Sequence, residues 1–292
     1  MKKQFLTLTA LLSLSLTSFA QNPQTGTTVI NKASQPCVYA DYQMPGSIVE
    51  GALKKKLTDA KIGSDSKASD GFRVYKGVVF QQISKDKMDL YVKVEEKKPI
   101  STVYILTSKG YDNFINKETD SNVINNSMAF LTNFLNDVNA FKLNKDIEAQ
   151  QDVIESAEKK NKSIAKDGES LLKDKSKIES KISKTNIEIG SLKSDMDNQQ
   201  KQLEAVKAKT ATIDQMDALK KEVSKQEDAA RKSIKKYNDA LKDAEDYKAD
   251  LKKNEDEIAK NKKEQEDQIA EVKKQKEALE AIKVELSKII IK

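Results

Sequence analysis

No proline occurs from Ile100 to Lys292, and after Gly110 only Gly168 and Gly190 interrupt that span. Proline destabilises a helix interior by about 3 kcal/mol and glycine by about 1 kcal/mol, so a span with so few of them can form very long helices. The same span is dense in Lys, Glu, Asp, Gln and Ala, and its apolar residues recur every three or four positions. This narrow stripe predicts the seam of a coiled coil rather than the broad face of a globular helix.

Two heptad registers account for the apolar stripe, and they differ by one residue. The first starts at Ile147 and the second at Met216. The change falls at 209–217 (KTATIDQMD), which contains the spacing of a capping box at a new helix start. This pattern predicts a hairpin turn near 207–214, although a stutter within one continuous helix would give the same slip.

A hairpin also places polar or small seam residues opposite one another, and apolar seam residues opposite one another. In the alignment that the sequence favours, Gly168 faces Asn254 and Leu171 faces Leu251, so that a positions meet d positions. The apolar run 279–291 then lies beside residues 128–135. Each buried Leu, Ile or Val contributes roughly 1.5–3 kcal/mol, against about 0.3–0.5 kcal/mol for an exposed ion pair. The apolar ends therefore decide the predicted alignment.

The chain before the long helices has a different composition and predicts a small α+β domain over 35–118. Residues 21–34 are polar and predict a flexible leader, and 119–292 form the arm. The domain is predicted to contain a strand, a helix and a three-strand meander, at 37–44, 47–62, 72–84, 88–95 and 101–108. The predicted fold is thus a small α+β domain followed by a long antiparallel coiled-coil helical hairpin, predominantly α overall.

The N-terminal residues 1–20 have the three parts of a secretory signal peptide. Two lysines precede an apolar run over 5–16, and a small-x-small sequence ends at Ala20. The run is shorter than the roughly 18–20 residues that span a bilayer. We expect an exported protein, periplasmic or secreted, with cleavage near Ala20–Gln21 and no integral membrane span in the mature chain.

Composition argues against several classes of chemistry. Histidine is absent, which removes the commonest general base and transition-metal ligand, and Cys37 is the only cysteine. Neither a GxxxxGK[ST] nor a GxGxxG motif occurs. The 52 basic and 46 acidic side chains give a net charge of only +6, without the concentrated charge that binds nucleic acid. We expect no enzyme and no cofactor, and assign no catalytic, cofactor-binding or metal-binding residues.

Four features carry a functional reading beside a structural one. Cys37 is either a buried small hydrophobe or a reactive thiol that bridges to another chain. The polar seam residues either set the register or loosen the arm so that it can open. Four tyrosines either line the sheet or form a partner face, and the C-terminal isoleucines either end the helix or add a strand. The residues concerned are Asn161, Gln199, Asn254, Asn261, Gln265 and Gln268 in the seam, Tyr39, Tyr91, Tyr104 and Tyr111 in the domain, and Ile289–Ile291 at the end.

Two resemblances follow from these segments. The blocks at 71–80, 88–97 and 101–115 (GFRVYKGVVF, MDLYVKVEEK and STVYILTSKGYDNFI), followed by a long charged helix, resemble uncharacterised secreted coiled-coil proteins of the Bacteroidota. The plan is also similar, in architecture only, to Skp-type periplasmic chaperones. In that family strands flank the hairpin on both sides, whereas here nearly all the strand signal precedes it.

These observations lead to one functional hypothesis and one alternative. The hypothesis is a non-enzymatic periplasmic structural or interaction protein, with a small docking domain and a coiled-coil spacer arm. Its partners would be proteins of the cell envelope, with self-association through the coiled coil as a further option. The alternative is a Skp-like holdase chaperone for unfolded envelope proteins.

Overall fold

The structure is a computed structural model that describes residues 22–110, 113–209 and 212–290. The predicted signal peptide and Tyr111 lie outside these residues. The chain divides into two compact units. The first contains the chain up to Gln151 together with the segment from Ala278 onward, and the second is the arm, Asp152–Glu277.

The first unit is built on a six-stranded sheet in which all paired neighbours are antiparallel. Its strand order is β1-β2-β6-β5-β4-β3. The strands are β1 (Gln24–Ile30), β2 (Ala33–Tyr42), β3 (Ser66–Lys67), β4 (Arg73–Val78), β5 (Met88–Lys97) and β6 (Ile100–Ser108). Together with the helices below, this confirms the predicted fold class, an α+β small domain in a predominantly α chain.

The predicted flexible leader at 21–34 is wrong over most of its length. Gln24–Ile30 forms β1, which pairs with β2 along its whole length. The connection is a two-residue turn in which Asn31 and Lys32 have φ values of 54° and 63°. Such left-handed turns match the twist of a hairpin, and Asn adopts that conformation readily. The polar composition of this segment hid the alternation of a half-exposed edge strand.

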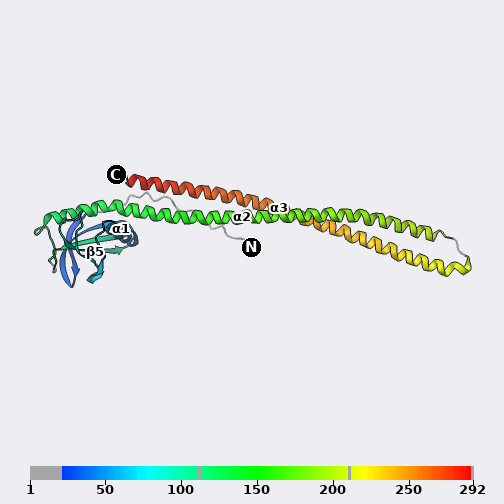
Figure 1. The fold of residues 1–292 in the computed structure, drawn as a ribbon, viewed down its shortest axis with the longest axis horizontal. Helices are drawn as coiled ribbons and strands as arrows, with labels where there is room; N and C mark the ends of the chain where they lie inside the picture. Colours follow the sequence, from blue (N-terminus) through cyan, green and yellow to red (C-terminus); the bar gives the residue numbers. More distant parts are fainter. Residues whose placement is uncertain (1–21, 111–112, 210–211, 291–292) are drawn as a thin grey trace. The chain divides into compact units, whose positions relative to one another are not determined.

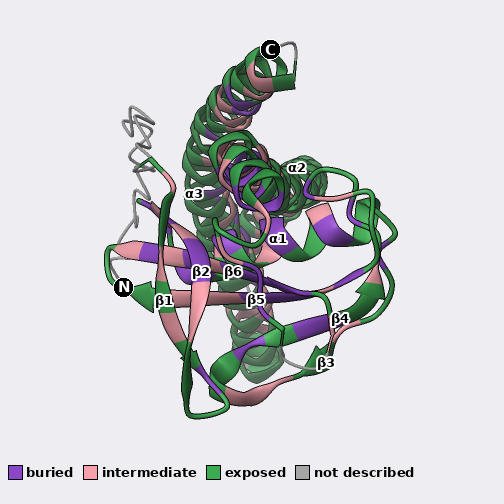
Figure 2. Cartoon of the chain, turned by 90° about the vertical axis from the view of Figure 1, so that its left-hand side faces the viewer, coloured by how far each residue is buried: buried purple, intermediate pink, exposed green. Residues whose placement is uncertain are grey.

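Two hydrophobic cores lie on opposite faces of the sheet. The larger one packs α1 (Gly46–Asp59) and the first turns of α2 (Ser121–Lys207) over one face, as Figure 2 shows. The smaller core lies on the other face and includes Cys37, Phe72 and Phe114. Over this face, the backbone N–H of Asn31 donates to Ser69 Oγ and Asp70 Oδ2, at 2.8 and 3.0 Å.

The first turns of α2 belong to the small domain although they continue into the arm. Helix α2 starts after Asp120, whose Oδ1 accepts a hydrogen bond from the N–H of Val123 at 3.2 Å, an N-cap contact. Phe134 and Val138 are fully buried against the sheet and α1. Figure 1 shows α1 and the sheet beside this part of α2. The packed domain therefore extends past residue 118.

The apolar end of the chain does not pack where the sequence predicted. The face of α2 expected to receive it, including Phe134 and Phe141, packs against the domain core instead. Leu279 and Ile282 are nonetheless buried, at 9% and 7% exposure, but they are not members of that core. Helix α3 (Met216–Ile290) remains helical to Ile290, so at that residue the predicted alternative of a short added strand is wrong.

The arm is an antiparallel pair of helices. Helix α2 ends at Lys207, a single turn of 3-10 helix covers Ile213–Gln215, and α3 begins at Met216. These bounds agree with the turn predicted near 207–214. Cross-helix contacts join residues near 158 to residues near 276 and residues near 207 to residues near 227, which establishes the antiparallel direction.

Candidate interaction surfaces

Three side-chain amides on α3 reach across the seam to the backbone of α2. Asn254 Nδ2 donates to the carbonyl oxygen of Leu171 at 3.3 Å, Asn261 Nδ2 to that of Ile164 at 3.0 Å, and Gln268 Nε2 to that of Ala157 at 3.2 Å. Both the donors and the acceptors are spaced by one heptad. We call the three donors, Asn254, Asn261 and Gln268, the amide ladder.

The ladder shows that the predicted alignment was wrong by one heptad. Gly168 faces Asn261 rather than Asn254: a β-carbon on Gly168 would lie 2.6 Å from Asn261 Oδ1. A slide of seven residues leaves every a position facing a d position, so the apolar pattern alone cannot choose between the two alignments. The two alignments are distinguished by the space beside Gly168, which Asn261 fills, and by the hydrogen bonds from the side-chain amides to the carbonyl groups of α2.

Among the residues that the structure describes, the same seam contains two side-chain oxygen atoms that lack a hydrogen-bond partner. They are Asn254 Oδ1 and Gln199 Oε1, both buried. Leaving a buried polar group unpaired costs about 1–3 kcal/mol, whereas a typical hydrogen bond contributes about 1 kcal/mol net. The polar seam residues therefore add little stability. Their positions at exact heptad intervals favour the role of setting the register.

The outside of the arm has two edges, one on each side of the seam. The edge formed by the e positions of both heptads, which we call the e edge, carries two ion pairs that join an e position of α2 to an e position of α3. Glu158 pairs with Lys276 at 2.7 Å and Lys207 pairs with Glu227 at 2.8 Å. On the opposite side, the g-position residues Lys209 and Glu222 pair at 2.7 Å. Pairs this exposed are screened by solvent, so they indicate which residues face each other more than they stabilise the arm.

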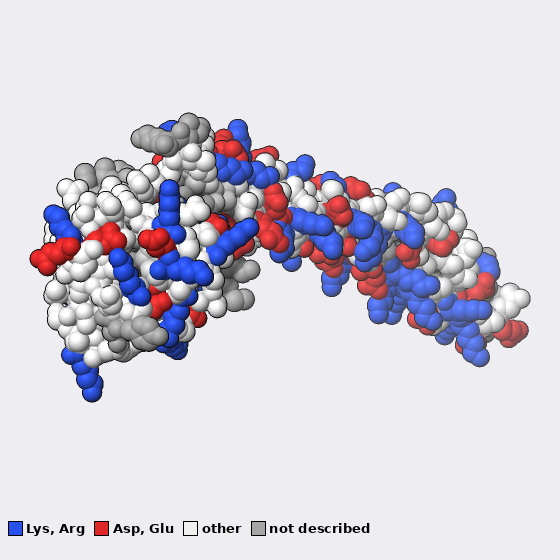
Figure 3. All heavy atoms as spheres, turned by 60° about the vertical axis from the view of Figure 1, so that its left-hand side comes forward, with Lys and Arg blue, Asp and Glu red and all other residues white. Residues whose placement is uncertain are grey.

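The e edge also displays large apolar side chains. Leu172 and Ile269 are 55% and 56% exposed, and Ile234 and Leu241 are 39% and 38% exposed. Along the view in Figure 3, basic and acidic side chains are interspersed over the helices. On α3, Lys248, Glu255 and Lys262 occupy the e positions between Leu241 and Ile269, so the apolar side chains are set among charges.

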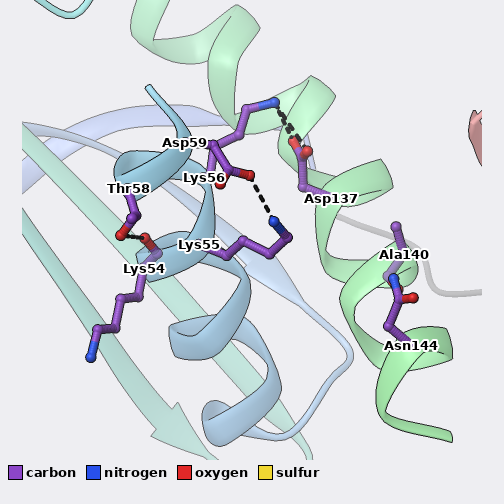
Figure 4. Close-up of polar contacts among 8 residues, drawn as sticks. All are labelled: Lys54, Lys55, Lys56, Thr58, Asp59, Asp137, Ala140 and Asn144. Atoms are coloured by element: carbon purple, nitrogen blue, oxygen red, sulfur yellow. Dashed lines mark hydrogen bonds and ion pairs between the residues drawn. The ribbon is translucent and has the colours of Figure 1, made fainter. Parts of the chain in front are cut away.

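A polar junction fixes α1 against α2 in the small domain. Lys56 Nζ lies 2.9 Å from Asp137 Oδ2, and both side chains are about one-third exposed or less. Figure 4 shows this pair beside the Lys55–Asp59 pair on α1, whose atoms are 2.8 Å apart. One turn before Lys55 in α1, Gly51 allows close approach, since a β-carbon there would lie 2.5 Å from Phe141 Cζ. The junction is an internal contact between two helices.

Two of the four tyrosines singled out in the sequence, Tyr39 and Tyr104, are neighbours on the sheet. The Tyr39 and Tyr104 rings lie 5.9 Å apart on the second face of the sheet, and Lys93 Nζ is 5.8 Å from the centre of the Tyr104 ring. We call Tyr39, Lys93 and Tyr104 the tyrosine–lysine patch. Burial, with a smaller contribution from Glu95, raises the pKa of Tyr104 to about 12. Tyr91 instead packs inside the second core against Phe114.

A small cleft lies between α1 and strands β4 and β5. Its volume of about 100 Å³ is below the roughly 300–1,000 Å³ of ordinary ligand pockets. Arg73 at its rim is paired with Asp65 at 2.6 Å and approaches Glu50 at 3.9 Å. The Arg73 guanidinium holds the pKa of Asp65 below its ordinary value. Arg73 thus pairs with carboxylates of the cleft itself, and we assign no ligand to the cleft.

Cys37 matches the structural reading of the sequence. It is 3% exposed in the second core, and burial raises the pKa of its thiol to about 11. A thiol so protonated is a poor nucleophile. Within the described residues, no group of His, Cys, Asp and Glu side chains is arranged to hold a metal ion. Across the same part of the chain, no helix combines the length and apolar character that a bilayer crossing requires.

No family model, curated protein or solved structure matches this chain.

Proposed function

We propose that this protein is a non-enzymatic structural or interaction protein of the cell envelope, in which the small domain docks and the arm acts as a spacer. The observation that carries the proposal is the amide ladder, Asn254, Asn261 and Gln268, which holds the two helices of the arm in one register. A spacer needs a fixed length. Side chains that contribute little stability but hold the register serve that need.

The docking face that we propose is the tyrosine–lysine patch. Tyr39 and Tyr104 are only partly buried, and tyrosine is enriched at protein interfaces because a rigid ring carries a polar end. Lys93 lies 5.5 Å from the centre of the Phe72 ring as well as near Tyr104, so its ammonium group is held over aromatic faces. This arrangement favours a partner that presents carboxylate and apolar groups together. The periplasm remains the proposed compartment.

The holdase alternative makes a different demand on the arm. A holdase that cradles unfolded clients needs a broad apolar surface, whereas the large apolar side chains of the e edge stand among lysines and glutamates. The two functions separate in one assay. Purified protein at a stoichiometric ratio is added to a denatured outer-membrane protein during refolding, and light scattering is followed. We expect no suppression of aggregation, and strong suppression would favour the holdase.

Docking is tested with the full chain immobilised and exposed to an envelope extract. A specific partner should be retained by the wild-type protein and lost from a Tyr39→Ala, Tyr104→Ala variant. The matched control is Tyr237→Ala, because Tyr237 is partly buried in the arm seam and lies in the other compact unit. Retention of the same proteins by the patch variant would contradict the assignment of the docking face.

A further inference from the structure

The e edge consists of eight levels that step along the arm by one heptad. The two outer levels are the observed ion pairs, Glu158 with Lys276 and Lys207 with Glu227. On each helix the same number of heptads separates the two ion-paired residues. The e positions between them therefore pair in order, one from α2 with one from α3 at each level. From the domain side to the tip they are Glu158 with Lys276, Ala165 with Ile269, Leu172 with Lys262, Glu179 with Glu255, Asn186 with Lys248, Lys193 with Leu241, Gln200 with Ile234, and Lys207 with Glu227.

The order of these levels is close to a palindrome. Each end of the edge carries one acidic and one basic residue, and the next two levels inward carry the exposed apolar residues. The two central levels are polar. On each helix separately, the two ends of the edge carry opposite charges: Glu158 and Lys207 on α2, and Lys276 and Glu227 on α3.

We infer that the e edge binds the e edge of a second copy of this chain, in antiparallel orientation, to form a four-helix dimer of arms. A two-fold axis that runs across the edge from α2 to α3 makes each helix face its own copy in reverse. Glu158 then faces Lys207 of the second copy, and Lys276 faces Glu227. Glu255, which pairs with Lys175 at 2.7 Å within the chain, gains Lys248 of the second copy.

The apolar residues meet in the same arrangement. Ile269 faces Ile234 of the second copy, and the symmetry repeats the contact. Leu172 and Leu241 lie diagonally opposite, each beside the aliphatic stem of a lysine, which can cover apolar surface while its ammonium group stays in water. In this arrangement no level places like charges opposite each other. The exposed apolar side chains of the edge are covered together.

Charge selects the antiparallel orientation over the parallel one. In a parallel dimer each level faces itself, with α2 opposite α3. Glu179 would then face Glu255 of the second copy twice, and Ile269 would face Ala165 rather than Ile234. Like charges directly opposite are destabilising, and the large apolar contact would be lost. The antiparallel dimer avoids both penalties.

Sedimentation velocity over a dilution series of the full chain measures the association. We expect a reversible monomer–dimer equilibrium. The variant Ile234→Lys, Ile269→Lys places lysines opposite each other and should weaken dimerisation on the order of 100-fold. The variant Ile234→Lys, Ile269→Glu places opposite charges there and should restore much of it. Ile187→Lys is the matched control, because Ile187 is 72% exposed at a position away from the e edge.

Disulfide trapping tests the orientation independently. In a Cys37→Ala background, single-cysteine chains Ile234→Cys and Ile269→Cys are mixed and oxidised, and the heterodisulfide should form. The pair Ala165→Cys and Ile269→Cys should not cross-link, although a parallel dimer would join them. A monomer at every concentration, equal behaviour of the two charge variants, or trapping of the second pair alone would overturn the inference. Circular dichroism checks that each variant is folded. Because the substituted isoleucines are exposed, we expect the fold to be retained.

Discussion

The side-chain oxygen Oδ1 of Asn261 lies 2.6 Å from the point where a β-carbon on Gly168 would be. The glycine and the asparagine therefore occupy a single space between the two helices of the arm. Glycine in a helix interior costs about 1 kcal/mol relative to alanine, and here that cost makes room for the hydrogen bond from Asn261 to Ile164.

The effect of Gly168→Ala should depend on residue 261. In an Asn261→Ala background we expect the substitution to raise the free energy of unfolding by up to about 1 kcal/mol through helix propensity, because the 2.6 Å contact is gone and only Gln265 Nε2, at 3.3 Å, must adjust. In the wild-type background the methyl group displaces the Asn261 amide, so the gain should vanish or reverse. Urea denaturation of the four proteins in this double-mutant cycle measures the coupling. Equal effects in both backgrounds would show that the two residues do not share the space.

Removal of the amide ladder should raise the stability of the arm but allow its two helices to pair in more than one register. Leucine at positions 254, 261 and 268 buries apolar surface and removes the unpaired oxygen of Asn254. The two alignments that differ by one heptad then become closer in energy. Spin labels at the exposed residues Lys173 and Lys242 should show one distance in the wild type and a second population in the variant, displaced along the arm by about 10 Å. A single unchanged distance would count against the ladder as the register device.

Shortening of the arm should be tolerated only when both helices lose matching heptads. In the observed register, residues 182–195 of α2 lie opposite residues 234–247 of α3. Deletion of both segments keeps the seam continuous, whereas deletion of 182–195 alone leaves α3 residues without a partner. We expect the single deletion to lower the melting temperature of the arm by at least about 5 °C relative to the matched deletion. Thermal melts followed by circular dichroism make the comparison, and an equal loss in both variants would mean that the register is different.

Two glycine substitutions should have opposite effects. Gly51→Ala places a methyl group 2.5 Å from Phe141 Cζ and should destabilise the small domain by about 1–3 kcal/mol through overpacking. Gly190→Ala meets no atom within 4 Å and should stabilise the arm by about 1 kcal/mol. Chemical denaturation measures both. If Gly51→Ala proves harmless, the close packing of α1 on α2 is incorrect.

Stability at alkaline pH should report on Tyr42. Its hydroxyl donates to the carbonyl oxygen of Leu131 at 2.6 Å, and burial, with a smaller contribution from Asp137, holds its pKa well above the ordinary range. The unfolded chain ionises this phenol near pH 10. The contribution is therefore complete below about pH 10 and is lost as the pH rises further.

The variant Tyr42→Phe should lose about 1 kcal/mol at neutral pH and show a shallower loss of stability above about pH 10. Tyr104→Phe is the comparison: because the pKa of Tyr104 is raised only to about 12, its removal should change the alkaline slope up to about that pH and not above it. Urea denaturation at several pH values gives both slopes. An unchanged slope in Tyr42→Phe would contradict the burial of a neutral phenol.

The helices and the central strands were predictable because each has a strong local signal. The alternation at Met88, Leu90 and Val92 reappears as a buried face, and the heptads of both arm helices as buried or half-buried stripes. Edge strand β1 was missed because an edge strand buries little, and Ile30 is its only fully buried residue. The local sequence signal for this strand is the turn at Asn31, and a single asparagine is a weak signal for a hairpin turn.

The alignment of the arm failed for a different physical reason. The pattern of apolar and polar residues in the seam repeats every seven residues. A shift of one helix by one heptad therefore keeps apolar positions facing apolar positions. The energy that distinguishes the slides comes from hydrogen bonds to main-chain carbonyls, such as that of Ile164, and from the missing side chain of Gly168. The sequence singled out Tyr39 and Tyr104 as residues that either line the sheet or form a partner face. Lys93 was not singled out, because its place over the rings depends on strand pairing.

The hydrogen-bond acceptors of the amide ladder are main-chain carbonyl groups, and every residue has such a group. Sequence drift at Leu171, Ile164 and Ala157 can therefore alter their side chains without removing what the amides bind. An insertion of one residue in α2 behaves differently, since it rotates and displaces all later carbonyls. The arm should accordingly tolerate many substitutions on α2 and few single-residue insertions, and its length should change, over generations, in whole heptads taken from both helices at once.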